Sequence, residues 1–304
     1  MNDAPTDIIS RETIGQGLKN MGIEPGDKIV MHSNLQSLGK ARVLTKLPNC
    51  GADALIDGFL DAVGPEGLLC LPTFTKTFAS PASGPVGDFY DPDTTHSRVG
   101  SITNVFLQKP GRVRSLHPTH SWAALGARAQ ELVEGHEKST TFGRDTLCGR
   151  MYDWDFKIVW FGTTGTTSTS THFPEDWLDL PYMATEDALV KDGDGFRKTQ
   201  VFRAPSGPRE FYKNGCKLDK LLETWNIQSE GLVHKATVKI MRHRTFINLL
   251  LRAMMNDPCL LLADGKDDAF HEQFYRLNVE HTRRFVAEHG GEDGVMQALN
   301  CQQE

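Results

Sequence analysis

The chain lacks the long apolar runs and the basic stretches that mark several large classes of protein. No apolar run in its 304 residues approaches the roughly 18–20 residues that a membrane-spanning helix needs. No five or six lysines and arginines follow one another, and the net charge is −6, which argues against nucleic-acid binding. We therefore expect neither a membrane nor a nucleic acid as partner.

Clustered cysteines are absent too. The six cysteines lie far apart and form no Cys-x-x-Cys pair, which predicts reduced thiols in a cytosolic protein. The polar, acidic residues 1–5 do not resemble a secretory signal, so we expect a cytoplasmic location. The histidines and aspartates have no zinc-like spacing, so we expect no metal. Cys148 with His172 could form a thiol nucleophile and its base, an alternative that thiol blocking would test.

What is present is the composition of an ordinary globular protein, with 39% hydrophobic and 24% charged residues. Through the first 165 residues short apolar stretches alternate with segments of helical spacing. Strands are predicted at 28–32, 67–72, 121–126 and 156–161, and helices at 11–21, 55–63, 98–108 and 127–136. This alternation predicts a layered α/β fold in which helices cover a largely buried sheet.

The second half of the chain has a different pattern. Strand-like pieces near 184–190, 198–204 and 232–240 alternate in polarity, and helices are predicted near 243–256 and 268–288. No repeat and no low-complexity linker interrupts the chain, so we expect one domain over residues 1–304. On the last predicted helix, Phe270, Phe274 and Leu277 form an apolar patch that could serve a homodimer as easily as the core.

The segment Thr171-His172-Phe173-Pro174-Glu175 carries the strongest chemical signal. Thr171 can cap a helix whose first turn holds His172, and His172 and Glu175 then share one helix face. A helix N-terminus disfavours an imidazolium, which helps to keep His172 neutral and able to accept a proton. Glu175 would orient the ring or attract a substrate ammonium. The same spacing also fits a histidine that only caps the helix and packs locally.

Two polar stretches follow predicted strands. Residues 162–171 are a run of Gly, Thr and Ser that can present hydroxyl and N–H groups to a carbonyl oxygen or a phosphate. Residues 32–39 follow the first strand, where α/β sheets bind ligands. Within them, 36–41 match the pyrophosphate loop of the GNAT acetyltransferases, but no clean amphipathic helix follows before Pro48. Residues 73–97 lack periodicity and predict a long functional loop. Acidic residues gather at 175–194, which would concentrate a polycationic substrate.

Five segments in order resemble the aminoglycoside 3-N-acetyltransferase family, also called the antibiotic N-acetyltransferases. Residues 27–39 contain its Val-His-Ser type of opening as Val-Met-His-Ser-Asn-Leu, and 71–75 contain its Pro-Thr-Phe. Residues 91–100 are similar to its Asp-Pro loop, 114–121 (Arg-Ser-Leu-His-Pro-Thr-His-Ser) to its most diagnostic segment, and Thr171-His172 with Glu175 to its catalytic strip. The resemblance implies an α/β/α fold with a central mixed sheet and an elaborated C-terminal half, distinct from GNAT.

The resemblance implies acetyl-CoA as donor and direct transfer to an amine of a small polar molecule, with the 3-amino group of an aminoglycoside as the first expectation. His172 would be the general base, Glu175 its carboxylate partner, and Thr171 would assist the developing oxyanion. The implied lining of the CoA channel is His32, Ser33, Asn34, Leu35, Thr73, Ser115 and His117.

Three alternatives stay open at this point. A member of the same family could acetylate an amine of another kind. A hydrolase could use a Ser or Thr nucleophile from residues 163–171, although no G-x-S-x-G elbow is present. A non-catalytic acyl-CoA-binding protein would keep its ligand affinity when His172 is replaced by alanine.

Overall fold

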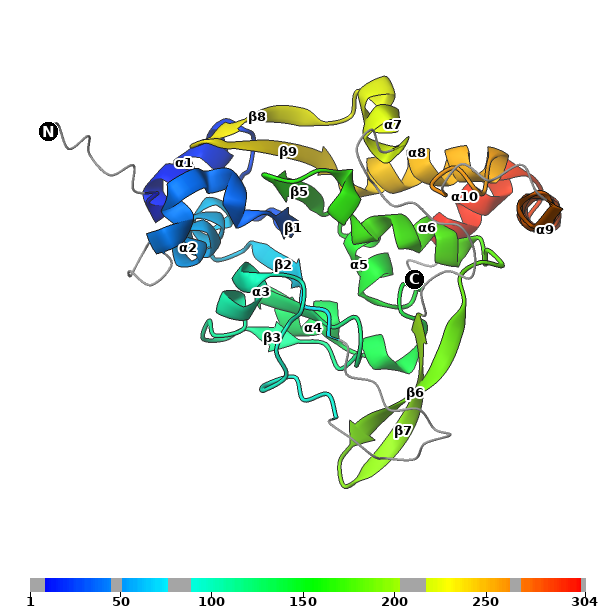
Figure 1. The fold of residues 1–304 in the computed structure, drawn as a ribbon, viewed down its shortest axis with the longest axis horizontal. Helices are drawn as coiled ribbons and strands as arrows, with labels where there is room; N and C mark the ends of the chain where they lie inside the picture. Colours follow the sequence, from blue (N-terminus) through cyan, green and yellow to red (C-terminus); the bar gives the residue numbers. More distant parts are fainter. Residues whose placement is uncertain (1–8, 45–50, 76–88, 203–216, 263–268, 302–304) are drawn as a thin grey trace, which may run out of the picture.

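A seven-stranded mixed sheet forms the centre of the protein in the computed structural model, which describes residues 9–44, 51–75, 89–202, 217–262 and 269–301 (Figure 1). The strand order is β3-β4-β2-β1-β5-β9-β8. Its strands are β1 (Lys28–Ser33), β2 (Leu68–Pro72), β3 (Val113–Arg114), β4 (Trp122–Gly126), β5 (Lys157–Phe161), β8 (Ser229–Val233) and β9 (Ala236–Arg242). The central strand β1 runs parallel to β2 and β5, and the outer pairs are antiparallel. The predicted mixed sheet is confirmed.

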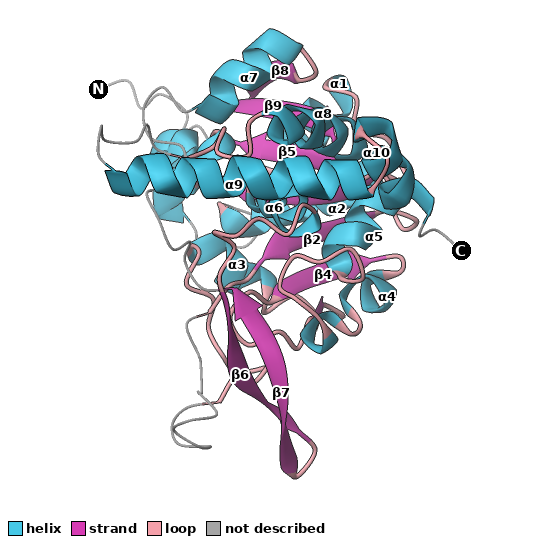
Figure 2. Ribbon diagram, turned by 90° about the vertical axis from the view of Figure 1, so that its right-hand side faces the viewer, coloured by secondary structure: helices cyan, strands magenta, loops and turns pink. Residues whose placement is uncertain are grey.

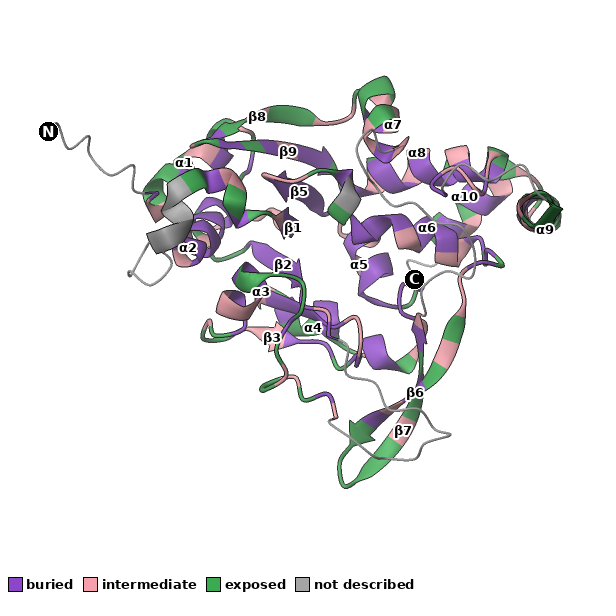
Figure 3. Ribbon diagram, in the orientation of Figure 1, coloured by how far each residue is buried: buried purple, intermediate pink, exposed green. Residues whose placement is uncertain are grey.

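The three parallel strands are the most buried part of the sheet, as Figure 3 shows. Every residue of β2 and β5 is buried, which explains why these strands are continuous apolar runs in the sequence. Side chains that alternate along β1 enter two different hydrophobic clusters, Val30 one and Met31 the other. The sheet therefore has a packed core on each face.

One face is covered by α1 (Arg11–Asn20), α2 (Ala52–Val63) and α3 (Ser101–Phe106). The first helix begins as predicted, because the Ser10 side chain accepts a hydrogen bond from the Thr13 N–H at 3.1 Å. The two longer helices pack closely at Gly58, where a Cβ atom would lie 2.6 Å from the Cβ of Ile14. This close approach leaves room for no larger residue than glycine.

The opposite face carries the helices that follow β4 in the chain (Figure 2). These are α4 (Ala129–Val133), α5 (Leu147–Asp153), α6 (His172–Trp177), α7 (Lys217–Trp225), α8 (His243–Asn256), α9 (Ala269–Glu288) and α10 (Glu292–Cys301). The predicted helix at 243–256 matches α8. Phe270 and Leu277 are exposed on α9, which is not the last helix because α10 follows it. None of the helices in the described ranges combines the length and apolar character of a membrane span.

A separate two-stranded sheet, β6 (Thr185–Asp192) with β7 (Gly195–Phe202), extends from the body (Figures 1 and 2). The single strand predicted at 232–240 is wrong, because a turn at 234–235 divides it into β8 and β9. His234 adopts a left-handed φ of 55° in that turn, and no glycine, proline or asparagine marks it in the sequence. Of the loop predicted at 73–97, residues 76–88 lie outside the described residues.

Candidate active site

His172 and Glu175 form a hydrogen-bonded pair at the start of α6. The imidazole Nδ1 lies 2.7 Å from Oε2 of Glu175. The Glu175 side chain is fully buried, while that of His172 is 14% exposed. Because a carboxylate oxygen accepts, Nδ1 carries the ring proton and the lone pair of the neutral ring is on Nε2. The three-residue spacing thus gives the geometry expected of a base with its orienting carboxylate.

Tyr182 fixes the other oxygen of this carboxylate. Its buried hydroxyl lies 3.2 Å from Oε1 of Glu175 and 3.2 Å from the carbonyl oxygen of Pro258. The tyrosine follows α6 and reaches back to it, so the contact is tertiary. No feature of the local sequence pattern marks Tyr182 as part of the site.

Thr171 does not cap α6, so that prediction is wrong. Its backbone is already helical, with φ −63° and ψ −25°, because a 3-10 turn over Thr169–Thr171 leads directly into the helix. Its buried hydroxyl donates to the carbonyl oxygen of Ser168 at 3.0 Å. His172 therefore follows a helical turn instead of starting from an extended cap residue.

Aromatic rings surround the imidazole of His172. Phe142 stacks on it with ring centroids 4.6 Å apart and an interplanar angle of 24°, and Phe202 lies 5.1 Å away. The ring of His120 contacts Phe142 at 5.4 Å and Phe74 at 4.8 Å. Phe142 and Phe202, from two distant segments, thus contact the ring of His172 directly, and His120 packs against Phe142.

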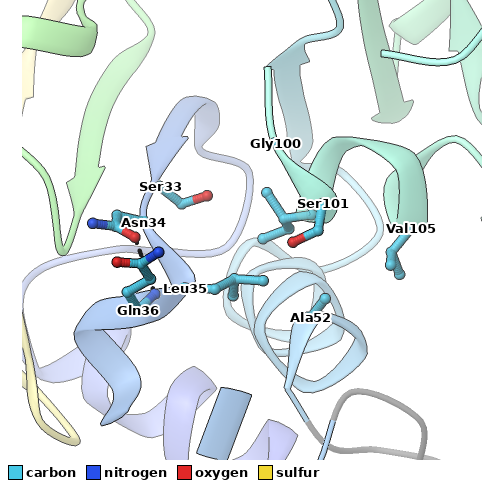
Figure 4. Close-up of a pocket in the computed structure, with 9 residues that line it drawn as sticks. Ser33, Asn34, Leu35, Gln36, Ala52, Gly100, Ser101 and Val105 are labelled. Atoms are coloured by element: carbon cyan, nitrogen blue, oxygen red, sulfur yellow. Dashed lines mark hydrogen bonds between the residues drawn. The ribbon is translucent and has the colours of Figure 1, made fainter. Parts of the chain in front are cut away.

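Two adjoining cavities lie at the ends of the central strands. The smaller, about 220 Å³, is lined by Met31, His32, Ser33, Leu71, Pro72, Phe74, Val99, Ile102, Thr103, Thr167 and Thr169. The larger, about 570 Å³, is lined by Ser33, Asn34, Leu35, Gln36, Ala52, Gly100, Ser101, Ile102 and Val105 (Figure 4). They share Ser33 and Ile102, so we treat them as one groove and call it the strand-end groove.

The strand-end groove reaches both helix starts and the His172 region. Figure 4 shows Leu35 pointing toward Ser101 and Ala52, the first residues of α3 and α2. First-turn N–H groups of a helix lack partners within that helix and attract negative groups. At its other end the groove is lined by Thr169, three residues before His172, and by Phe74, whose ring contacts that of His120.

The predicted cofactor residues fall into two groups. His32, Ser33, Asn34 and Leu35 all line the strand-end groove. Thr73, Ser115 and His117 are buried and are not among its lining residues. These three bind neighbouring protein groups instead: the Thr73 hydroxyl donates to Ser121 O at 3.0 Å, Ser115 Oγ accepts from Trp122 N, and His117 contacts Thr141.

Burial controls the charge of two further groups near the site. It lowers the pKa of His32 to about 4, so this ring is neutral at pH 7. It raises the pKa of the Asp176 carboxyl, next to Glu175, to about 7, with a smaller contribution from the charge of Asp145. Burial also raises the pKa of the Cys148 thiol to about 12, which makes it a poor nucleophile and argues against the thiol alternative.

The sequence of this chain is similar to those of a known enzyme family. The model of the family described as aminoglycoside 3-N-acetyltransferase matches residues 30–255. Aminoglycoside N(3)-acetyltransferase IV of Salmonella sp is 26% identical over 262 residues, which cover 83% of this chain and 89% of the relative. Aminoglycoside N(3)-acetyltransferase IX of Micromonospora chalcea is 26% identical over 57% of this chain and 63% of its own length.

Solved structures share the fold at lower identity. A variant of aminoglycoside acetyltransferase AAC(3)-IVa in complex with gentamicin superposes with a TM-score of 0.71 at 20% identity, covering 92% of this chain and 100% of the other. The binary complex of AAC-IIIb with CoA superposes with a TM-score of 0.68 at 19% identity, covering 81% of this chain and 96% of the other. The predicted α/β class with an elaborated C-terminal half is thereby confirmed. Since the family model spans most of the chain and both sequence relatives carry the same activity in their names, this protein belongs to the aminoglycoside 3-N-acetyltransferase family and is an N-acetyltransferase.

Proposed function

We propose that the protein transfers the acetyl group of acetyl-CoA directly to an amine of a polar, polycationic molecule, with an aminoglycoside as the first candidate. The observation that carries the proposal is the His172–Glu175 pair, together with Thr169, three residues before His172, in the lining of the strand-end groove. The names of the relatives support the acceptor, and the CoA complex of a protein with the same fold supports the donor.

The strand-end groove is the proposed path of acetyl-CoA. Ser33, Asn34 and Ser101 offer hydrogen bonds to the polar parts of the cofactor, while Leu35 and Ile102 offer apolar contact to its pantetheine arm. The first turns of α2 and α3 favour the negatively charged phosphates. With the phosphates at that end, the thioester would lie toward Thr169 and the rings around His172.

In the proposed reaction the substrate amine attacks the thioester carbon and gives its proton to Nε2 of His172. Glu175 holds the Nδ1 proton and stabilises the imidazolium that forms, as a buried carboxylate partner does in a catalytic triad. The C–N bond forms, the C–S bond breaks, and the thiolate of CoA takes a proton from the imidazolium. Thr169, which lines the groove, is the proposed donor to the oxyanion, because the Thr171 hydroxyl already donates to the carbonyl oxygen of Ser168.

A bulky side chain in the strand-end groove tests whether acetyl-CoA binds there. We expect Ser101→Phe to raise the KM for acetyl-CoA at least tenfold and to leave the KM for the acceptor within about twofold, because only the strand-end groove is narrowed. Steady-state assays that follow thiol release measure both constants. Ser229→Phe on the exposed edge strand β8 is the matched control. Unchanged acetyl-CoA kinetics in Ser101→Phe would place the cofactor elsewhere.

Loss of the Tyr182 hydroxyl should have a modest effect on kcat. Tyr182→Phe should lower kcat about fivefold, since one hydrogen bond to a charged group contributes about 1 kcal/mol or more. The loss should fall on kcat, because the tyrosine touches Glu175 and not the groove. Tyr152→Phe, which loses hydrogen bonds to Asn248 and Asn300 instead, should reduce stability and keep kcat. Equal kcat values in the two variants would remove Tyr182 from the site.

A further inference from the structure

Thr141 is a buried residue that joins three segments around the aromatic rings of the site. It is 1% exposed, and its carbonyl oxygen lies 2.8 Å from Nε2 of His136. Its hydroxyl oxygen accepts a hydrogen bond from the backbone N–H of Phe202 at 2.7 Å and lies 3.1 Å from Nε2 of His117.

The hydrogen-bond partners fix the tautomers of the two histidines. A carbonyl oxygen only accepts, so His136 donates from Nε2 to Thr141 and accepts at Nδ1 from the Ser115 hydroxyl, 3.0 Å away. His117 accepts at Nδ1 from the His120 N–H at 3.1 Å and therefore donates from Nε2. The acceptors of that proton are Thr141 Oγ1 and, at 3.3 Å, the carbonyl oxygen of Gln200.

Both imidazoles are neutral donors and acceptors in this network. Burial lowers the pKa of His136 to about 4 and that of His117 well below its usual range. The two rings stack with centroids 4.6 Å apart. Two positively charged imidazolium rings would repel each other at this distance. The network is thus built for the uncharged forms and holds its geometry at neutral pH.

The network ends at the two rings that flank the catalytic imidazole. Phe142 is the next residue after Thr141, and the N–H of Phe202 is bound by the Thr141 hydroxyl. Their rings lie 5.4 Å apart and contact His172 at 4.6 and 5.1 Å. Since Glu175 holds one nitrogen of His172 and the rings hold its plane, together they set the direction of Nε2.

We propose that Thr141 is a positioning residue of the reaction, whose hydroxyl places Phe142 and Phe202 and through them aims Nε2 of His172. This inference rests on the proposed role of His172 as the base. It gives Ser115 and His117 the task of supporting Thr141 in place of a contact with CoA. A displacement of about 1 Å at a catalytic group can cost up to about 10²-fold in rate.

The test compares Thr141→Val with Thr141→Ser. Valine keeps the shape and removes the hydroxyl, so kcat should fall roughly tenfold while the KM for acetyl-CoA changes less than twofold. Serine should recover most of the lost rate. The acid limb of the pH–rate profile should move in Thr141→Val and return in Thr141→Ser, which a change in stability alone would not produce.

A second readout does not depend on activity. In NMR spectra of the histidine rings, assigned with His172→Gln, the ring signals of His172 should be displaced in Thr141→Val, because Phe142 and Phe202 no longer hold their native positions against that ring. The Nδ1–H tautomer should persist, since Glu175 still accepts this proton. If Thr141→Val does not fold, Phe202→Leu removes one contacting ring and should displace the same signals and the pH–rate profile.

Three results would overturn the proposal. These are native kcat and native His172 ring signals in the folded valine variant, a loss confined to the KM for acetyl-CoA, and a serine variant as slow as the valine variant. If the native protein transferred no acetyl group, the proposed function would fail, and the NMR comparison would still decide whether Thr141 positions His172.

Discussion

Replacement of His172 by alanine is expected to lower kcat by roughly 10²–10⁴-fold, the range in which a general base contributes. The amine must lose a proton as it attacks the thioester, and His172 is the ring that Glu175 holds at 2.7 Å and that packs against two phenylalanines. The KM for acetyl-CoA should stay within about threefold, because His172 is not among the residues that line the strand-end groove.

Two further variants separate the role of the base from that of its partner. Glu175→Gln should lower kcat by less than His172→Ala does, because the amide oxygen still accepts the Nδ1–H of His172. It should lower kcat nonetheless, because a neutral amide does not stabilise the imidazolium. His289→Ala, in the turn that follows α9, is the histidine control and should be fully active. A His172→Ala variant with more than a tenth of the native kcat would exclude the imidazole as the base.

The protein is expected to lose about 5 kcal/mol of unfolding free energy between pH 7.5 and 5.5. Five histidines have pKa values that burial lowers far below 6.5: His32, His117, His120, His136 and His243. Below pH 6.5 each binds a proton in the unfolded chain but not in the folded one. Their contribution to stability is therefore complete above 6.5 and is lost as the pH falls.

The magnitude follows from one proton per histidine. Each contributes about 1.4 kcal/mol per pH unit below 6.5, or about 7 kcal/mol for five at pH 5.5. Asp176 acts in the opposite direction, because its pKa is raised to about 7 and the folded state keeps its proton at a pH where the unfolded chain has lost it. The protonated Asp176 therefore offsets about 2 kcal/mol of the stability lost through the histidines. The remaining loss is comparable with the whole stability of a typical domain, about 5–15 kcal/mol.

Urea unfolding at a series of pH values measures the effect. The slope near pH 5.5 should correspond to about four protons taken up on unfolding, five from the histidines less one from Asp176. His243→Gln should reduce the slope by about one proton, since it removes one buried neutral ring. An unfolding free energy that stays level from pH 7.5 to 5.5 would show that these rings are not held neutral.

Local patterns in the sequence predicted the parts of the site that are local in space. His172 and Glu175 are three residues apart on one helix, so their spacing was enough to predict the pair. Tyr182 and Phe202 reach the site through tertiary packing, which no periodicity records. The cap assigned to Thr171 was wrong because a 3-10 turn precedes the helix and makes its backbone helical.

The same distinction holds for the fold. Helix α8 has a clear apolar stripe and was predicted with its bounds, whereas α5, α7 and α10 were not predicted. Resemblance to the family implied a central mixed sheet with an elaborated C-terminal half, but neither the order of the strands nor the contacts of single residues. Ser115 and His117 belong to its most diagnostic segment, yet both are buried and bind neighbouring protein groups.

The fate of the acetyl group is the most direct test of the central claim that His172 drives direct transfer to an amine. Acetyl-CoA carrying a labelled acetyl group is incubated with the native protein and a panel of aminoglycosides and other polyamines, and all products are weighed by mass spectrometry. We predict one labelled acetyl group on an acceptor amine for each thiol released, with His172→Ala slower by roughly 10²–10⁴-fold. Label found as free acetate or on the protein, with no acetylated amine, would contradict the account.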